Sequence, residues 1–192
     1  MKYCSTCGAR VTLTVPAGDN RERYVCVDCG DIHYQNPNVV VGTIPVHIDD
    51  NGVPSILLCL RSIEPRHGYW TLPAGFLENG ETSTTGALRE TEEESCAAIE
   101  NLQLFRVFNV AQVNQIHMFF NADLPKAEFS PTPESSEVKL FGFDQIPWEE
   151  LAFPTVHKAL KDYIEHWPNQ AFSIAMVDID NRYWRRMHKH DA

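Results

Sequence analysis

The sequence predicts an α/β domain preceded by a small β module, and three observations lead to this expectation. Two C-x-x-C pairs lie close to the N-terminus, β-like runs recur through residues 39–143, and two segments show helical periodicity. A chain of 192 residues with 43% hydrophobic content can bury one full-sized core and little more than an appendage. We expect a zinc ribbon over residues 1–34, a main domain over 35–170 and a C-terminal extension over 171–192.

The charge balance is acidic, with 26 Asp and Glu against 16 Lys and Arg and a net charge of -10. A broad surface that follows the phosphates of DNA or RNA is therefore not expected, although a phosphorylated small molecule could bind locally through a metal ion. The N-terminus shows no apolar stretch behind basic residues, and no window approaches eighteen apolar residues. We expect a soluble, cytoplasmic protein that does not enter a membrane.

The N-terminal cysteines are Cys4, Cys7, Cys26 and Cys29, and a glycine follows each pair. Four thiolates at this spacing are typical of a closed structural Zn²⁺ site. β-like runs at 10–15 and 23–27 flank a turn at 16–20, so a zinc ribbon results, and metal binding would supply most of its folding energy. Zinc ribbons serve as nucleic-acid readers, protein contacts or structural caps, and the mixed charges of this one favour a cap or a partner contact.

The main domain reads as a series of strands interrupted by two helices. Residues 39–47 and 55–61 form a hairpin around the turn at 49–52, and further strands are expected at 102–110, 115–121 and 138–143. Residues 155–167 show the apolar spacing of a core-packing helix. One more strand is expected within 172–179, followed by a basic and aromatic end at 182–186 that suits a dimer contact or a surface tail.

The other helix, at about 83–96, gathers negative charge. At 100° per residue Glu90, Glu93 and Glu94 fall within an arc of about 100°, whereas Glu92 points to the opposite side. The inward face would consist of Thr84, Ala87, Leu88, Thr91 and Ser95. A solvated acidic face is the usual explanation for such a helix. Two penalties oppose that explanation here: like charges at i+3 and i+4 repel one another, and they lie in the half of the helix where the macrodipole is negative. A bound divalent cation would relieve both.

The segment before this helix, Trp70-Thr-Leu-Pro73-Ala-Gly75, continues through Gly80 to Glu81. Its glycines let the backbone approach a ligand and orient carbonyl oxygens. A hard cation such as Mg²⁺ takes oxygen ligands and keeps some of its waters, so carboxylates and one backbone carbonyl suffice. The combination favours phosphoryl transfer to water. In such a reaction the metal neutralises the diphosphate, and either a carboxylate or a metal-bound hydroxide supplies the attacking water.

The spacing Gly75, five residues, Glu81, seven residues and Arg89-Glu90-Thr91-Glu92-Glu93-Glu94 closely resembles the Nudix box. The match covers 23 residues and is highly specific. The sequence departs from the pattern at Thr91, where an aliphatic residue is usual, at Cys96, where the box has glycine, and at Ala97, a small closing aliphatic. All the charged positions are kept, so we expect a competent site.

The resemblance implies a Nudix α/β/α sandwich with a mixed sheet and hydrolysis of a nucleoside diphosphate linked to another moiety, with Mg²⁺ or Mn²⁺. By position in the box, Glu90, Glu93 and Glu94 would be metal ligands, and the carbonyl of Ala74 or Gly75 would complete the shell.

The resemblance also implies roles around the metal. Arg89 and Glu81 would orient the helix, with Glu81 and Gly75 also close to the substrate. Family members often recruit an acid from a later loop as base or extra ligand. The first candidate for that acid is Glu137, with Glu134 second, against a plain surface role for both.

A zinc ribbon followed by a Nudix domain narrows the range of expected substrates. This order resembles two subgroups, the NADH pyrophosphatases and the plant plastid hydrolases of FAD and ADP-ribose. The S-Q-P-W-P-F-P-x-S array of the NADH subgroup does not follow this box. The stretches that look like the FAD and ADP-ribose type lie at residues 34–38, 58–61, 68–78, 133–137, 146–148 and 151–153. We therefore favour FAD or ADP-ribose. An NADH diphosphatase, or a non-catalytic regulator whose ribbon contacts nucleic acid or protein, is the alternative.

The remaining candidates concern substrate contacts and assembly. Arg61 and Arg66 could pair with phosphates, although solvation is the commoner fate of such side chains. The aromatic residues that could stack on an adenine or flavin ring, or simply fill the core, are Tyr69, Trp70, Phe119 and Phe120. The resemblance allows a homodimer.

Overall fold

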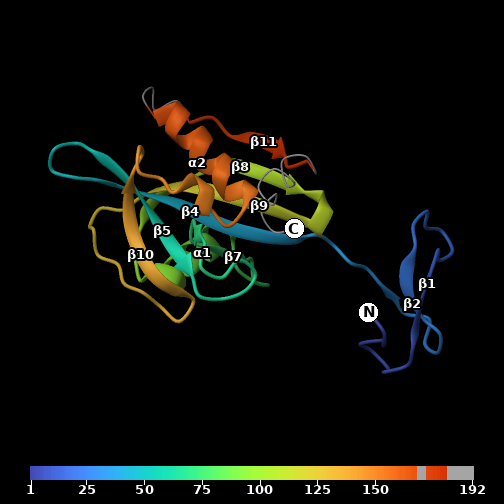
Figure 1. Cartoon of the computed structure of the whole chain (residues 1–192). Coiled ribbons are helices and arrows are strands. Elements are labelled where there is room, and N and C mark those ends of the chain that lie inside the picture. Colours follow the sequence, from blue (N-terminus) through green and yellow to red (C-terminus); the bar gives the residue numbers. More distant parts are fainter. Residues whose placement is uncertain (168–171, 181–192) are drawn as a thin grey trace. The chain divides into compact units, whose positions relative to one another are not determined.

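The computed structural model describes residues 1–167 and 172–180, and the chain divides into two units, Met1–Pro37 and Asn38–Ala192 (Figure 1). The expected basic and aromatic end at 182–186 lies outside the described residues. Among the residues that are described, no helix is long and apolar enough to cross a membrane.

The first unit is an antiparallel sheet in the order β1-β2-β3. Its strands are β1 (Val11–Thr14), β2 (Arg23–Cys26) and β3 (Ile32–His33). The first two strands confirm the predicted ribbon runs. Gly18, with φ of 85°, supplies the left-handed residue that the turn between them needs. β3 was not expected, since two residues are too short for a strand pattern in the sequence.

The second unit is built on a mixed sheet in the order β10-β5-β4-β9-β8-β11. Its strands are β4 (Asn38–Ile48), β5 (Pro54–Arg61), β8 (Glu100–Val110), β9 (Gln115–Asp123), β10 (Ser135–Gly142) and β11 (Ala175–Asp178). The predicted hairpin is confirmed as β4 and β5, and β4–β9 and β8–β11 are parallel pairs. Two short strands, β6 (Trp70–Thr71) and β7 (Ala74–Phe76), join β5 and β4.

Side chains along each strand alternate between two apolar layers. Ile56 and Leu58 pack in a cluster with Leu160 of α2 (Pro154–His166), whereas Leu57 and Cys59 pack with Ala97, which follows α1 (Ser83–Ser95). In Figure 1 the two helices accordingly lie on opposite faces of the sheet. The expected α/β/α sandwich is confirmed. Two 3₁₀ turns, η1 (Ala111–Val113) and η2 (Trp148–Glu150), fill connections.

β7 lies very close to β4 because residue 42 is glycine. A Cβ on Gly42 would lie 2.5 Å from the Cβ of Ala74 and 2.8 Å from the carbonyl oxygen of Pro73. Both contacts are shorter than real Cβ atoms tolerate, so a side chain at this position would push β7 away. Since α1 packs against β4 and β7 together, the approach fixes the backbone of residues 74–76 beside the acidic helix.

Both ends of α1 have identifiable caps. The side chain of Thr82 accepts a hydrogen bond from the Thr85 N–H at 3.2 Å, and the helix stops at Cys96, whose φ of 54° is left-handed. Glycine adopts that conformation without strain, which explains why the box has glycine there. Cys96 keeps the geometry, and its N–H donates to the Glu92 carbonyl at 2.7 Å.

The inward face of α1 was predicted incorrectly in part. Ala87, Thr91 and Ser95 are buried, but Leu88 is 40% exposed and Thr84 is exposed as well. Glu94 takes up the missing inward position and is only 5% exposed. Helical periodicity assigned the apolar leucine to the core, whereas the backbone of β7 offers a hydrogen bond that draws a carboxylate inward.

Candidate active site and zinc centre

The four cysteine sulfurs of the ribbon converge. They all lie within 4.8 Å of one another, with Sγ–Sγ distances of 3.8 Å for Cys4 and Cys29 and 3.4 Å for Cys7 and Cys26. A tetrahedral ion with Zn–S bonds of about 2.3 Å places its sulfurs about 3.8 Å apart. The donor set and its size therefore fit Zn²⁺, in agreement with the sequence.

Polar neighbours contact one of these sulfurs, that of Cys4. The Thr6 N–H donates to Cys4 Sγ at 3.4 Å, and His33 Nε2 lies 3.3 Å from the same sulfur. Donors of this kind hold a thiolate ligand in place. The sequence pattern did not point to His33, because β3 was not recognised.

The three box glutamates of α1 differ sharply in exposure. Glu94 is buried and its Oε2 accepts the Ala74 N–H at 3.0 Å, the Glu90 side chain is 12% exposed, and the Glu93 side chain is 57% exposed. The backbone of β7 lies against Glu90, since a Cβ on Gly75 would come within 2.2 Å of the Glu90 carboxylate. Glycine is therefore required at this position for the carboxylate and the backbone to share one small space.

Arg89 connects the glutamates to the preceding loop. Its Nη1 donates to Glu90 Oε1 at 2.7 Å and to Glu93 Oε2 at 2.9 Å, while Nη2 donates to Glu81 Oε1 at 2.8 Å and to the Phe76 carbonyl at 3.1 Å. The hydrogen bonds to Arg89 lower the pKa of Glu81. One guanidinium thus holds three carboxylates and the strand β7 in a fixed arrangement.

Burial works against the charge on the inner two carboxylates. It raises the pKa of Glu94 to about 8 and also raises the pKa of Glu90. The negative charge of Glu134 adds to both shifts, and the positive charge of Arg61 opposes the shift of Glu94. A divalent cation bound at this place would offset the cost of burial, because its positive charge stabilises the ionised carboxylates in place of water.

The candidate donor set consists of hard oxygens from Glu90, Glu93, Glu94 and the carbonyls of residues 74 and 75, and this chemistry suits Mg²⁺ or Mn²⁺. In the described part of the chain these carboxylates do not gather within 4.8 Å as the cysteine sulfurs do. One oxygen of each carboxylate accepts a hydrogen bond from Arg89 or Ala74. Since Mg²⁺ retains waters and needs only one or two carboxylates directly, the residues fit the ion.

The two loop acids are placed differently. Glu134 precedes β10, and its charge acts on Glu90 and Glu94. Glu137 is an exposed residue within β10, opposite Leu60 of β5. The electrostatic contact therefore involves the second candidate, Glu134. Glu137 was ranked first on the expectation that one loop extends over both residues. Instead, β10 begins between them, so Glu137 lies in the strand.

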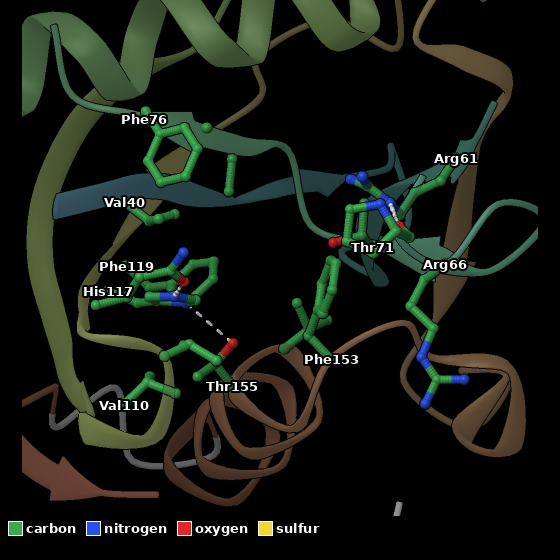
Figure 2. A pocket seen from close by; sticks show the side chains of 16 residues that line it. Val40, Arg61, Arg66, Thr71, Phe76, Val110, His117, Phe119, Phe153 and Thr155 are labelled. Atoms are coloured by element: carbon green, nitrogen blue, oxygen red, sulfur yellow. Dashed lines mark hydrogen bonds between the residues drawn. The ribbon is translucent and has the colours of Figure 1, made fainter. Parts of the chain in front are cut away.

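A cavity of about 440 Å³ opens beside Ala74 and Gly75. Arg61 and Arg66 lie toward one end, while Val40, Val110 and Phe119 line the other (Figure 2). Arg61 is 9% exposed, and its Nε donates to the Pro65 carbonyl at 2.9 Å. Its guanidinium lies 5.2 Å from the centre of the Phe153 ring, and that of Arg66 lies 5.0 Å from the Tyr69 ring.

Of the four candidate stacking aromatics, Phe119 lines this cavity. Phe120 points to the opposite face and packs with Ala87 of α1, as strand alternation requires. Trp70 belongs to the core, where its ring meets Phe141 edge-on at 4.8 Å, and Tyr69 lies beneath Arg66.

The sequence reasoning missed polar residues at the apolar end of the cavity. His117 Nδ1 lies 3.2 Å from Thr155 Oγ1, and its Nε2 lies 2.8 Å from Gln115 Oε1. Strand alternation could have revealed His117, because it shares a face with Phe119. Thr155 could not have been found, since nothing in the sequence tells which strand the start of α2 will reach.

A mixed sheet between two helices, with glutamates of one helix against a glycine-containing strand and a cysteine-rich ribbon as a separate unit, defines the class of Nudix-type proteins with a zinc ribbon. Family models agree. The Nudix N-terminal zinc ribbon matches residues 2–35, and the NUDIX domain matches residues 37–165. The chain belongs to the Nudix hydrolase family.

Two solved structures can be compared with the chain in more detail. A NUDIX hydrolase structure from Nitrosomonas europaea superposes with a TM-score of 0.86 at 45% identity, covering 93% of this chain and 99% of that one. The NUDIX domain of Shewanella oneidensis NrtR, solved in complex with ADP ribose, shares 19% identity and a TM-score of 0.61 over 70% of this chain and 90% of that chain, and supports the fold alone.

Curated relatives carry the name NAD-capped RNA hydrolase NudC. The protein of Vibrio parahaemolyticus is 30% identical over 77% of this chain and 53% of its own length, and that of Photobacterium profundum is 33% identical over 69% and 46%. The chain thus spans about half the length of these relatives.

The zinc centre yields a first prediction. Cys26→Ser removes one of four thiolate ligands, so we expect loss of bound zinc and a lower unfolding temperature of the ribbon, with kcat for diphosphate hydrolysis within about twofold of the parent. Elemental analysis and thermal unfolding measure this. Cys96→Ser is the matched control, because that thiol is exposed and lies outside the ribbon. A large loss of kcat with zinc and stability intact would contradict a structural centre.

The environment of His117 yields a second prediction. Burial lowers the pKa of His117 to about 4, whereas an unfolded histidine titrates near 6.5. Its contribution to stability is therefore present above pH 6.5 and is lost as the pH falls toward 4, by up to about 3 kcal/mol. Denaturant unfolding of the parent and of His117→Gln across this range isolates the effect. Equal pH slopes in the two proteins would show that His117 is not held neutral.

Proposed function

We propose that this chain hydrolyses the diphosphate bond of a nucleoside diphosphate linked to a second moiety. The observation that carries the proposal is the position of Glu90 and Glu94 against the β7 residues Ala74 and Gly75, which in turn line a cavity that also holds Arg61. Carboxylates that are costly to bury, next to a strand that lines a cavity with a cationic side chain, suit a metal-bound diphosphate.

In this proposal Glu90, Glu93 and Glu94 hold Mg²⁺ or Mn²⁺ together with a carbonyl of residue 74 or 75. The metal, when bound, neutralises the diphosphate and lowers the pKa of an attacking water. Arg89 keeps the carboxylates in register with β7, and Arg61 and Arg66 pair with phosphate oxygens. We assign the loop base, or extra ligand, to Glu134, whose charge already acts on Glu90 and Glu94.

Two considerations point to different substrates. The array typical of NADH pyrophosphatases is missing after the box, which favours FAD or ADP-ribose. The names of the curated relatives favour NAD-type substrates, including NAD-capped RNA, as a second candidate. The net charge of -10 makes a small dinucleotide the simpler ligand, because a long RNA needs a cationic path.

The test is a substrate panel with Mg²⁺: FAD, ADP-ribose, NADH and NAD-capped RNA, ranked by kcat/KM with AMP or 5′-monophosphate RNA as the product. We expect FAD or ADP-ribose to rank first. A clear preference for NADH or capped RNA would move the protein to the second candidate. No turnover of any diphosphate, together with tight binding of DNA or RNA, would support a regulator instead of an enzyme.

The exposed ligand yields a sharp test. Glu93→Gln should lower kcat by two or more orders of magnitude while leaving the unfolding temperature unchanged, because the side chain is 57% exposed and contributes a charge rather than a core contact. Glu92→Gln is the matched control, since Glu92 is exposed on the same helix and points away from the site. Unfolding of the Glu93 variant would instead indicate a structural role.

The loop acids can be compared as a pair. Glu134→Gln should reduce kcat by at least tenfold, whereas Glu137→Gln should leave it within about twofold, because the charge of Glu134 acts on Glu90 and Glu94 and Glu137 is an exposed residue within β10. Steady-state kinetics at saturating metal measure both. The reverse order would restore Glu137 as the base, and two unaffected variants would place the base within the box.

A further inference from the structure

The apolar end of the cavity is placed relative to β7 by the register of three strands. Val40 of β4 pairs with Phe76 of β7 on one side and with His117 of β9 on the other. Neighbouring strands are about 4.8 Å apart, so His117 lies about 10 Å across the sheet from the strand that carries Gly75. The rigid sheet therefore holds the apolar end of the cavity at a set distance from the candidate metal site.

The hydrogen bonds of His117 fix its protonation pattern. A carboxamide oxygen can only accept, so with the amide oriented as in the structure His117 Nε2 carries the proton and donates to Gln115 Oε1 at 2.8 Å. The other ring nitrogen, Nδ1, then holds a lone pair and accepts from the Thr155 hydroxyl at 3.2 Å. Thr155 is 2% exposed, which leaves its hydroxyl little freedom to bond elsewhere.

This chain of bonds also fixes Gln115. Its carbonyl oxygen is occupied by His117, so its NH₂ group is the part that remains to meet a ligand. Among the residues that the structure describes, no acceptor is recorded for this group, and Gln115 is a wall residue of the cavity. A glutamine left free could present either a donor or an acceptor, whereas this one presents a donor.

The surroundings suit an uncharged ring. Val40, Val110 and Phe119 form apolar walls around His117, and Arg61 and Arg66 lie at the far end (Figure 2). Burial keeps His117 neutral, so this end offers no charge to a phosphate. A phosphate-bearing group is thus drawn to the arginines and a flat apolar group to the valines and Phe119.

We propose that Gln115, His117 and Thr155 form a relay that determines specificity, in which Thr155 and His117 orient the Gln115 amide so that its NH₂ donates to a carbonyl oxygen or ring nitrogen on an uncharged heteroaromatic ring of the substrate. Gln115 is the contacting residue, and His117 and Thr155 are positioning residues. The inference rests on the proposed function, because it assigns the ring of that substrate to this cavity.

The test separates binding from turnover. Calorimetry without added Mg²⁺ gives Kd for ADP-ribose, FAD and NADH, and steady-state assays with Mg²⁺ give kcat and KM for the same compounds. The variants are Gln115→Glu, which keeps the acceptor and loses the donor, Gln115→Met, which loses both without adding charge, and Thr155→Val with its conservative partner Thr155→Ser.

We expect both Gln115 variants to raise Kd and KM by about three- to tenfold for the preferred compound and to leave kcat within about twofold, since one hydrogen bond to the ring is lost. Thr155→Val should show the same KM effect, and Thr155→Ser should restore the parent values. A merely structural role would lower the unfolding temperature without this split between KM and kcat.

Three results would overturn the relay. Unchanged Kd in both Gln115 variants would show that no ring is bound here, and a Gln115→Glu variant that binds like the parent while Gln115→Met does not would show that the amide acts as an acceptor. A fall in kcat at constant KM would move these residues to the chemical step. If no compound is hydrolysed by the parent, the proposed function fails, and the Kd shifts still decide the relay.

Discussion

The site depends on the close approach of β7 to the acidic helix, at the point where the Ala74 N–H meets the buried carboxylate of Glu94. Gly75 permits this approach, since a Cβ there would clash with Glu90, and Gly42 lets β7 lie close to β4, since a Cβ there would clash with Ala74. One backbone N–H does not compensate a carboxylate removed from water, and the raised pKa of Glu94 records the deficit. A cation bound at this place would offset that deficit.

Arg89 explains how the helix tolerates its own charges before a cation arrives. Its guanidinium joins Glu90 and Glu93 of the helix to Glu81 and to the backbone of β7. A planar fork of donors suits this work better than the single ammonium group of lysine. A bound cation would compete with Arg89 for the same oxygens of Glu90 and Glu93. Arg89 therefore holds these carboxylates in place in the absence of the cation.

The sequence predicted the features that local spacing determines. The cysteine pairs, the hairpin β4–β5, the helix with Glu90 and its glycine-containing approach all follow from intervals of a few residues. Features that depend on which segments become neighbours were missed or misjudged. The burial of Glu94 in place of Leu88 follows from the presence of β7, and the meeting of His117 with Thr155 follows from where α2 begins. No periodicity along one segment contains that information.

The parallel pairing of β4 with β9 positions residues of the site that lie outside the Nudix box. Phe76 of β7 and His117 of β9 both lie opposite Val40, so the strand that carries Ala74 and Gly75 and the apolar end of the cavity are held at a separation set by strand spacing. A sheet cannot change that spacing by small steps. Under the proposed function, substrate choice would then come from the side chains that β9 and the start of α2 present, apart from the helix that carries Glu90, Glu93 and Glu94.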